Sequence, residues 1–354
     1  MQRLMAEISS GKRCGVEAIE ALLLIAEWEP RCMLPDSARI SCGQEDLAAW
    51  MHVGMAIRLA HALKLDNTVY KKESNEAALR ERPAWMACYL SNRQISVRLG
   101  RPFSCRGLEP SIIYGRYGFP AVYSNRAGHD SFACIFRARL ELTQIYTNVH
   151  ETLYCHLEKD AQRIVSGTYT ALLDNFRGVI AAWHSVWGSL TCSPNVKILL
   201  QLSYEYLRLY TNAFAFQTFI LRESSTRDLP SDAIGIDRIG GTGALPEARF
   251  IFEAIDAAKS LLTTFNNYLL PKTTIMHFPV RFPLYCVNAT VFLYSTWIAS
   301  LLSAPEKASV RRLIADTIKR FREGSEGSEE ASKPWAQICQ LVGSSMEAHR
   351  RGQG

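Results

Sequence analysis

The sequence predicts an all-α fold, a large irregular helical domain of packed antiparallel helices. Apolar residues recur at spacings of three and four along most of the chain, which is the pattern of one helix face. No run of alternating apolar and polar residues is long enough to form a central sheet. The composition, with 48% hydrophobic and 21% charged residues among 354, is that of a globular protein and excludes a disordered or fibrous chain.

Two helices are predicted near the N-terminus. Residues 16–28 are strongly apolar, and Pro30 ends this first helix. Residues 45–65 have the clearest helical spacing, and their apolar surface is so wide that little of this helix is expected to face water. Gly54 on the apolar face is expected to let a neighbouring helix approach closely, and Arg58, one turn further, needs an acidic partner if it is buried.

A third helix is predicted over residues 75–99. Pro83 lies within it, so this helix is expected to kink or to begin anew there. Gly100 and Pro102 end the helix, because glycine adopts the conformation of a C-terminal turn and proline cannot continue a helix. Residues 103–130 are rich in glycine, proline, tyrosine and serine, and they are predicted to form a long irregular connection.

The remainder of the chain shows further helical patterns, interrupted by polar segments. The segment 223–245 is predicted to be a second long loop, and the segment 323–333 a short acidic hinge. The predicted helices cover residues 131–165, 168–190, 195–222, 246–269, 283–303, 305–322 and 333–349. We divide the chain into residues 1–110 and 111–354 and expect both parts to share one continuous core.

One apolar segment needs comparison with a membrane span. Residues 282–305 contain no charged side chain and are long enough to cross a bilayer. Pro283, Asn288 and several serines and threonines interrupt this segment, which favours a buried core helix. We therefore expect no contact with a membrane.

The ten cysteines are scattered, and no two are closer than ten residues. A zinc finger, a zinc ribbon or a thioredoxin-type pair needs cysteines within a few residues of each other, so none of these is predicted. The N-terminus lacks an apolar signal segment, which favours a reducing compartment, the cytosol or the nucleus. The net charge of +6 permits an acidic partner but does not require one.

The signatures of common enzymes are missing from the sequence. There is no GxSxG elbow, no HExxH pair and no Walker A loop. Acidic residues that could act in catalysis, such as Asp160, Asp174 and Glu205, are dispersed along the chain, and no DDxxD run occurs. We predict no enzyme, no catalytic residue, no bound metal and no cofactor. An all-helical enzyme of unrecognised type is the alternative.

A basic run lies in a predicted helix near the C-terminal end. Arg311 and Arg312 are followed by Lys319, Arg320 and Arg322, beside the apolar residues of an amphipathic pattern. A solvated helix face is the plainer interpretation. Binding of phosphate, or a nuclear import signal, is the alternative.

Three segments, in this order and separation, resemble the middle homology region of fungal zinc-cluster transcription factors. The first reads EALLLIAEWEPR over residues 20–31, and the second reads AAWMHVGMAIRLA over residues 48–60. The third, over residues 82–102, has the spaced Arg, Trp, Asn-Arg and Gly-Arg-Pro of that region. The resemblance covers about residues 15–110.

The resemblance implies a structural role for most of the motif residues. These structural residues are Trp50, Gly54, Arg58, Asn92, Gly100 and Pro102. The family has an Asp-Arg pair where this chain has Asn92 and Arg93, so Arg93 must find a carboxylate elsewhere or bind carbonyl groups. Candidate residues for an effector pocket between helices are Trp85, Arg93 and Arg101.

The resemblance also implies a regulatory domain that acts in the nucleus, senses a small-molecule effector or a partner, and modulates transcription. Members of the family carry a cluster of closely spaced cysteines that binds zinc and reads DNA, and no such cluster occurs in this sequence. We therefore expect DNA contact only through a missing zinc cluster or a partner, which is another transcription regulator or a second copy. A cluster-less corepressor or dimerisation subunit is the alternative.

Overall fold

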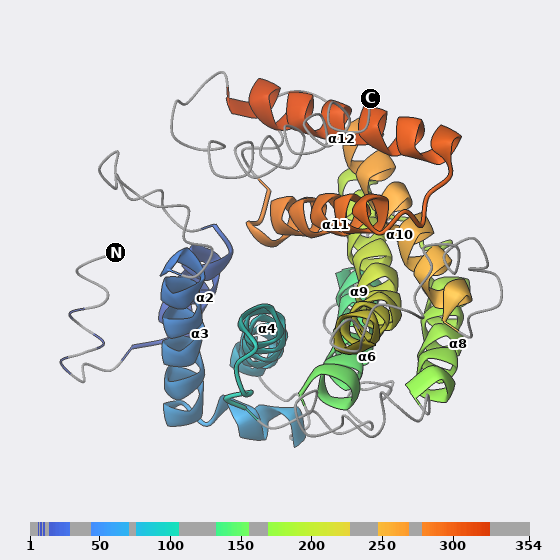
Figure 1. Cartoon of the computed structure of the whole chain (residues 1–354). Helices are drawn as coiled ribbons and strands as arrows, with labels where there is room; N and C mark the ends of the chain where they lie inside the picture. Colours follow the sequence, from blue (N-terminus) through green and yellow to red (C-terminus); the bar gives the residue numbers. More distant parts are fainter. Residues whose placement is uncertain are drawn as a thin grey trace. The chain divides into compact units, whose positions relative to one another are not determined.

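The structure is a computed structural model, and it describes residues 6, 8, 10, 14–28, 44–70, 76–105, 132–155, 169–226, 247–268 and 278–325. Every regular element within these residues is a helix (Figure 1). The prediction of an all-α fold is therefore confirmed. The predicted helix at 333–349, and most of the predicted loops at 103–130 and 223–245, lie outside the described residues.

The chain divides by spatial proximity into two compact units, Met1–Thr147 and Asn148–Gly354. The border lies further along the chain than the division after residue 110 that the sequence suggests. That the two parts share one core stays a prediction, and each unit is described by itself.

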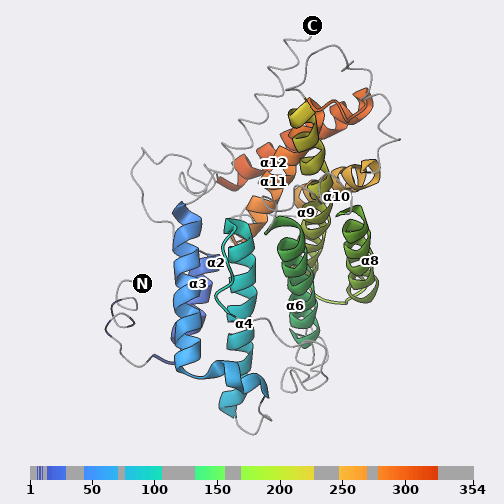
Figure 2. The same cartoon turned by 60° about the horizontal axis from the view of Figure 1, so that its bottom comes forward.

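The first unit contains α2 (Val16–Glu27), α3 (Gln44–Ala62), the 3₁₀ helix η1 (Leu65–Tyr70), α4 (Glu76–Leu99) and α6 (Phe132–Val149), whose last residues belong to the second unit. The helices predicted over 16–28, 45–65 and 75–99 are confirmed. α2, α3 and α4 pack side by side (Figure 2). α4 continues through Pro83 and does not begin anew there.

An apolar core holds the first unit together. Its members include Ile19 and Leu22 of α2, Val53 and Ala56 of α3, Met86 and Tyr89 of α4, and Leu140 of α6. Full burial of one large apolar side chain contributes about 1.5–3 kcal/mol. Each helix by itself has only an apolar stripe. Burial of these stripes in one shared core therefore accounts for the association of the helices.

α3 buries one face and leaves the other outside. Leu47 is 43% exposed and Met51 is 48% exposed, and Arg58 is exposed as well. The prediction that little of this helix faces water is therefore wrong. Apolar residues surround α3 on most sides, so their spacing does not distinguish the face that packs on α2 and α4 from the outward face.

The second unit contains the π-helix η3 (His150–Tyr154), α8 (Tyr169–Trp187), α9 (Pro194–Thr226), α10 (Ala248–Tyr268), α11 (Arg281–Ile298) and α12 (Ala304–Ser325). The predicted helices that begin at 168, 195, 246, 283 and 305 are confirmed. α9 extends to residue 226, beyond the predicted end at 222.

The predicted helix over 131–165 changes its geometry before its expected end. α-Helical geometry ends at Val149, and a π-turn follows. The imidazole Nδ1 of His150 lies 2.8 Å from the Tyr210 hydroxyl, and the Tyr154 hydroxyl donates to the Tyr210 carbonyl oxygen at 2.7 Å. These contacts with α9 stabilise the wider turn, which helical spacing alone does not predict.

α10 packs against α9, α11 and α12 in the second unit (Figure 1). Its buried residues include Ala254, Ala257, Ala258, Leu261, Leu262 and Phe265. The alanine side chains are short, which allows neighbouring helices to pack close to the backbone of α10.

α11 is a buried core helix, as predicted for the uncharged segment 282–305. Phe282, Cys286, Ala289 and Leu293 are each at most 1% exposed. Within the described part of the chain, no helix combines the length and the hydropathy needed to cross a bilayer.

Candidate functional site

The end of α4 is a glycine-dependent turn. Gly100 has a φ of +60°, and the N–H of Arg101 donates to the Ser96 carbonyl oxygen at 2.8 Å. The N–H of Gly100 donates to the Val97 carbonyl oxygen at 3.2 Å. The Ser96 hydroxyl also reaches the Pro102 carbonyl oxygen at 3.4 Å. This paired bonding satisfies carbonyls at the helix end and directs the chain back along α4.

Asn92 binds the loop that follows this turn. Its side chain is 1% exposed, and its Oδ1 accepts hydrogen bonds from the backbone N–H of Ser104 at 3.1 Å and of Cys105 at 3.4 Å. The Cys105 thiol donates to the same oxygen at 3.3 Å. An aspartate would accept these backbone groups with a carboxylate oxygen. The amide oxygen of Asn92 therefore supplies the acceptor that the family pattern places here.

Arg93 is buried beneath the same loop. It is 4% exposed, and its Nη2 donates to the Cys105 carbonyl oxygen at 3.1 Å. The guanidinium carbon lies 3.8 Å from the centroid of the Phe103 ring and 5.0 Å from that of Tyr89. Of the two alternatives from the sequence, a carboxylate elsewhere or carbonyl groups, the structure shows a carbonyl oxygen as an acceptor for Arg93. The aromatic faces add cation–π stabilisation.

The three predicted effector-binding residues have different surroundings. Trp85 is 6% exposed within the core of the first unit. Its ring packs edge-to-face with the His61 imidazole, and the two ring centroids are 5.1 Å apart. Arg93 is buried, as described above. Arg101 is exposed, and its guanidinium carbon lies 5.7 Å from the centroid of the Trp50 ring. A role of these residues in effector binding stays a prediction.

Gly54 and Arg58 lie on the outward face of α3. Within the part of the chain that the structure describes, no heavy atom beyond the adjacent residues and the backbone of α3 itself lies within 4 Å of the position that a Cβ at Gly54 would occupy. The close approach of a helix that was expected at Gly54 is therefore wrong. Arg58 is exposed, so water solvates its charge and the acidic partner that burial would require is not needed.

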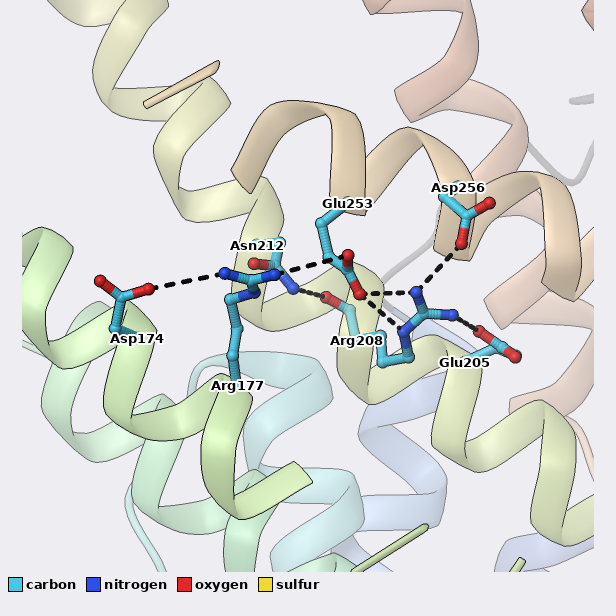
Figure 3. Close-up of polar contacts among 7 residues, drawn as sticks. All are labelled: Asp174, Arg177, Glu205, Arg208, Asn212, Glu253 and Asp256. Carbon is cyan, nitrogen blue, oxygen red and sulfur yellow. Dashed lines mark hydrogen bonds and ion pairs between the residues drawn. The ribbon is translucent and has the colours of Figure 1, made fainter. Parts of the chain in front are cut away.

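A network of charged side chains joins α8, α9 and α10 in the second unit (Figure 3). Arg208 of α9 contacts the carboxylates of three residues. It donates from Nη1 to Glu205 at 2.7 Å, from Nε to Glu253 at 3.0 Å and from Nη2 to Asp256 at 3.0 Å. Glu253 and Asp256 come from α10, so Arg208 ties this helix to α9.

Arg177 connects α8 to the same network. Its guanidinium lies 3.5 Å from a carboxylate oxygen of Asp174 and 3.7 Å from one of Glu253. Asn212 lies one turn beyond Arg208 and donates from Nδ2 to its carbonyl oxygen at 2.8 Å (Figure 3). Glu253 is therefore shared between the two guanidinium groups.

The electrostatics of this network favour a structural role. Glu205 is 5% exposed; burial raises the pKa of its carboxyl, while Arg208 and Gln201 act in the opposite direction. Arg208 neutralises the charge of the buried Glu205 carboxylate, as a buried carboxylate requires. Among the residues described, no group of three or more His, Cys, Asp or Glu side chains is placed to hold a metal ion.

The sequence did not predict this network. Asp174 and Glu205 are dispersed along the chain, as the sequence shows, and each pairs with an arginine of its own helix. Glu253 of α10 contacts both of these arginines and so joins the two pairs into one network. Asp160 lies outside the described residues. The spacing of three between Glu205 and Arg208 was the available signal, since residues three apart on a helix are neighbours. The contribution of α10 could not be seen in that spacing.

Comparisons with known proteins support the resemblance found in the sequence. Residues 32–113 match the family model described as Fungal specific transcription factor domain. The chain is 21% identical over 402 aligned residues to a protein of Aspergillus fumigatus named Transcription factor hmgR, with 97% of this chain and 51% of that protein covered. The chain thus spans about half the length of this relative. No zinc-cluster domain is detected, and no solved structure matches.

Proposed function

We propose, from the fungal specific transcription factor domain that residues 32–113 carry, that this chain is the regulatory part of a fungal transcription regulator. It acts in the nucleus, performs no catalysis, and modulates transcription in response to an effector or a protein partner. The observation that carries the proposal is the domain match itself. Among the described residues, the match covers α3, η1, α4 and residues 100–105 after it.

The loop after α4 is the element that we assign to sensing. Arg101 is exposed beside Trp50, and the turn at Gly100 holds it there. A guanidinium next to an indole suits an anionic or aromatic group of an effector or partner. Beneath the surface, Asn92 and Arg93 bind the backbone of residues 104 and 105, so movement of the loop is transmitted directly to α4.

The absence of catalysis is proposed from the charged network of the second unit. An all-helical enzyme would use carboxylates that converge on a substrate. Glu205, Glu253 and Asp256 converge instead on Arg208, which occupies the centre and holds their charges. This arrangement supports a network that joins helices more than an acid–base site.

A tethered reporter assay tests the proposed function. The full chain is fused to an unrelated DNA-binding domain, and expression of a reporter with matching sites is measured in a fungal host. We expect the fusion to change reporter expression relative to the DNA-binding domain alone, and Arg101→Ala to reduce that change. Lys197→Ala, which removes an exposed cation of α9, is the matched control and should have no effect.

Two results would contradict the proposal. One is reporter expression that is the same with and without the fused chain. The other is a chain that, when expressed with a fluorescent tag at its natural level, stays outside the nucleus. An equal loss of response in Arg101→Ala and Lys197→Ala would remove Arg101 from the sensing element.

A further inference from the structure

We propose that the outward face of α12 binds the phosphate backbone of duplex DNA without reading its sequence. This inference goes beyond the proposed function, whose sensing element lies in the first unit and which assigns no role to α12. It rests on three observations. One face of α12 packs on α10, the opposite face exposes a row of cations, and no large apolar side chain is exposed on that face among the described residues.

Packing against α10 determines which face of α12 is buried. Val310, Ile314 and Phe321 are each at most 1% exposed, and the Phe321 ring lies 5.1 Å from that of Phe265 in α10. Asn266 of α10 donates from Nδ2 to the Thr317 hydroxyl at 3.1 Å. These contacts form an apolar stripe with one buried hydrogen bond, so the opposite side of α12 faces outward.

The outward side carries a row of cations. Arg311, Arg312, Lys319 and Arg322 are all exposed. At 1.5 Å per residue, the row extends over about 16 Å along the helix. Exposed Ala308 and Ala315 lie between and beside the cations, and their short side chains let a flat or convex surface approach the row.

The acidic residues of α12 cancel only part of this charge. Glu306 accepts hydrogen bonds from Ser303 at the start of the helix and lies 3.5 Å from Lys259. Glu323 lies 3.9 Å from Lys319 and 4.0 Å from Arg320, which are long contacts. Asp316 is exposed on one flank of the row.

Arg311 and Arg312 have no ion-pair partner among the side chains that the structure describes. These two arginines therefore remain available to an anion, while Lys319 shares its charge with Glu323 through a long contact. The row is therefore basic in the folded protein as well as in the sequence.

The chemistry of this face favours a nucleic-acid backbone over an acidic polypeptide. Protein partners are held mainly by a few large apolar or aromatic anchors. No large apolar side chain of α12 is exposed among the described residues, and the exposed positions between Arg312 and Lys319 are Ala315 and Asp316. A phosphate backbone, in contrast, is bound by cations alone through the release of counterions.

The proposal has a quantitative consequence. Contacts to three or four phosphates give a slope of about −3 in a plot of log K against log salt concentration, with dissociation constants of about 10⁻⁴–10⁻⁶ M near physiological salt. Such binding carries no sequence information. It would hold a regulator near DNA while sequence is read by a zinc cluster or by a partner.

The experiment uses the full chain and a fluorescently labelled duplex of arbitrary sequence. Anisotropy is recorded between about 50 and 200 mM salt. We expect the double substitution Arg311→Glu with Arg312→Glu to weaken binding at least about ten-fold at the lowest salt and to reduce the slope by about two. The double substitution Arg58→Glu with Lys197→Glu makes the same change in net charge on α3 and α9 instead of α12 and should leave binding within about two-fold.

Each outcome supports or overturns the proposal. Equal competition by unlabelled duplexes of different sequence supports it. Equal weakening by both double variants overturns it, because net charge and not α12 would then explain the binding. Tighter binding of polyglutamate than of duplex, or a slope near zero, also overturns it. Failure here leaves the reporter assay unaffected, since that assay tethers the chain to DNA through another domain.

Discussion

At the scale of single residues, the loop after α4 depends on acceptor chemistry more than on charge. Asn92 stands where the related family has aspartate, yet its Oδ1 accepts from two backbone N–H groups of the loop. Arg93 binds the carbonyl oxygen of Cys105, whose N–H is bound by Asn92. The two side chains thus hold one peptide segment from both of its polar groups.

Substitution of Asn92 separates acceptor chemistry from charge. Asn92→Ala is expected to cost about 1–3 kcal/mol, because two backbone N–H groups, of which that of Cys105 is buried, lose their acceptor. Asn92→Asp is expected to cost clearly less, since a carboxylate oxygen accepts from the same groups and lies next to Arg93. Urea denaturation followed by circular dichroism measures both. Equal destabilisation by the two variants would contradict this account.

Two glycines of the family motif should respond in opposite directions to the same change. Gly100→Ala is expected to destabilise the protein by about 1–2 kcal/mol, because its φ of +60° is unfavourable for a residue with a Cβ. Gly54→Ala is expected to stabilise it by up to about 1 kcal/mol, because alanine favours the helix and its Cβ would meet open space. Midpoints of thermal unfolding show whether each substitution stabilises or destabilises the protein. Destabilisation by both would contradict the open space described beside Gly54.

At the scale of elements, helices of the second unit are joined by polar as well as apolar contacts. α9 and α10 share a partly buried ion-pair network centred on Arg208, while α10 and α12 share an aromatic contact and the hydrogen bond between Asn266 and Thr317. Carboxylates in this unit therefore position helices, and their burial depends on a guanidinium at the centre.

The network predicts a non-additive response to substitution. Arg208→Met is expected to cost about 3 kcal/mol, because the buried carboxylate of Glu205 loses its cation, while the half-buried Glu253 loses less. The double substitution Arg208→Met with Glu205→Leu is expected to recover part of this loss, since one uncompensated carboxylate is removed. A double-mutant cycle from chemical denaturation measures the coupling. Strict additivity of the two substitutions would mean that Glu205 and Arg208 do not interact in solution.

At the scale of the whole molecule, two compact units follow one another along the chain, and α6 extends past the border between them. The sequence predicts one continuous core for both parts. A single core implies that one unit does not unfold while the other stays folded.

Cooperativity therefore tests the predicted single core. We expect α4 of the first unit and α10 of the second to lose protection from hydrogen exchange at the same denaturant concentration, as followed by mass spectrometry of their peptides. Loss of protection at clearly separate concentrations would show two cores, with a domain border near Thr147.

Much of the fold was predictable because local pattern governs helix formation. The helices at 16–28, 75–99 and 246–269 are confirmed, and so is the helix-ending turn at Gly100, because each depends on residues near in sequence. The outward face of α3 and the π-turn after Val149 were not predictable. Both depend on which helix, distant in sequence, packs against the segment, and the pattern of nearby residues does not predict that contact.

The sequence by itself determined the helical class, the positions of most helices and the family resemblance, since helical periodicity, caps and motif spacing are properties of short segments. Tertiary structure decided the rest. It placed Arg93 on a carbonyl oxygen and left open space, among the described residues, where a Cβ at Gly54 would lie. It also joined the ion pairs of Asp174 and Glu205 through Glu253 and turned the cations of α12 outward. The physical reason is that burial and charge compensation depend on side chains far apart in the chain, and only packing brings these together.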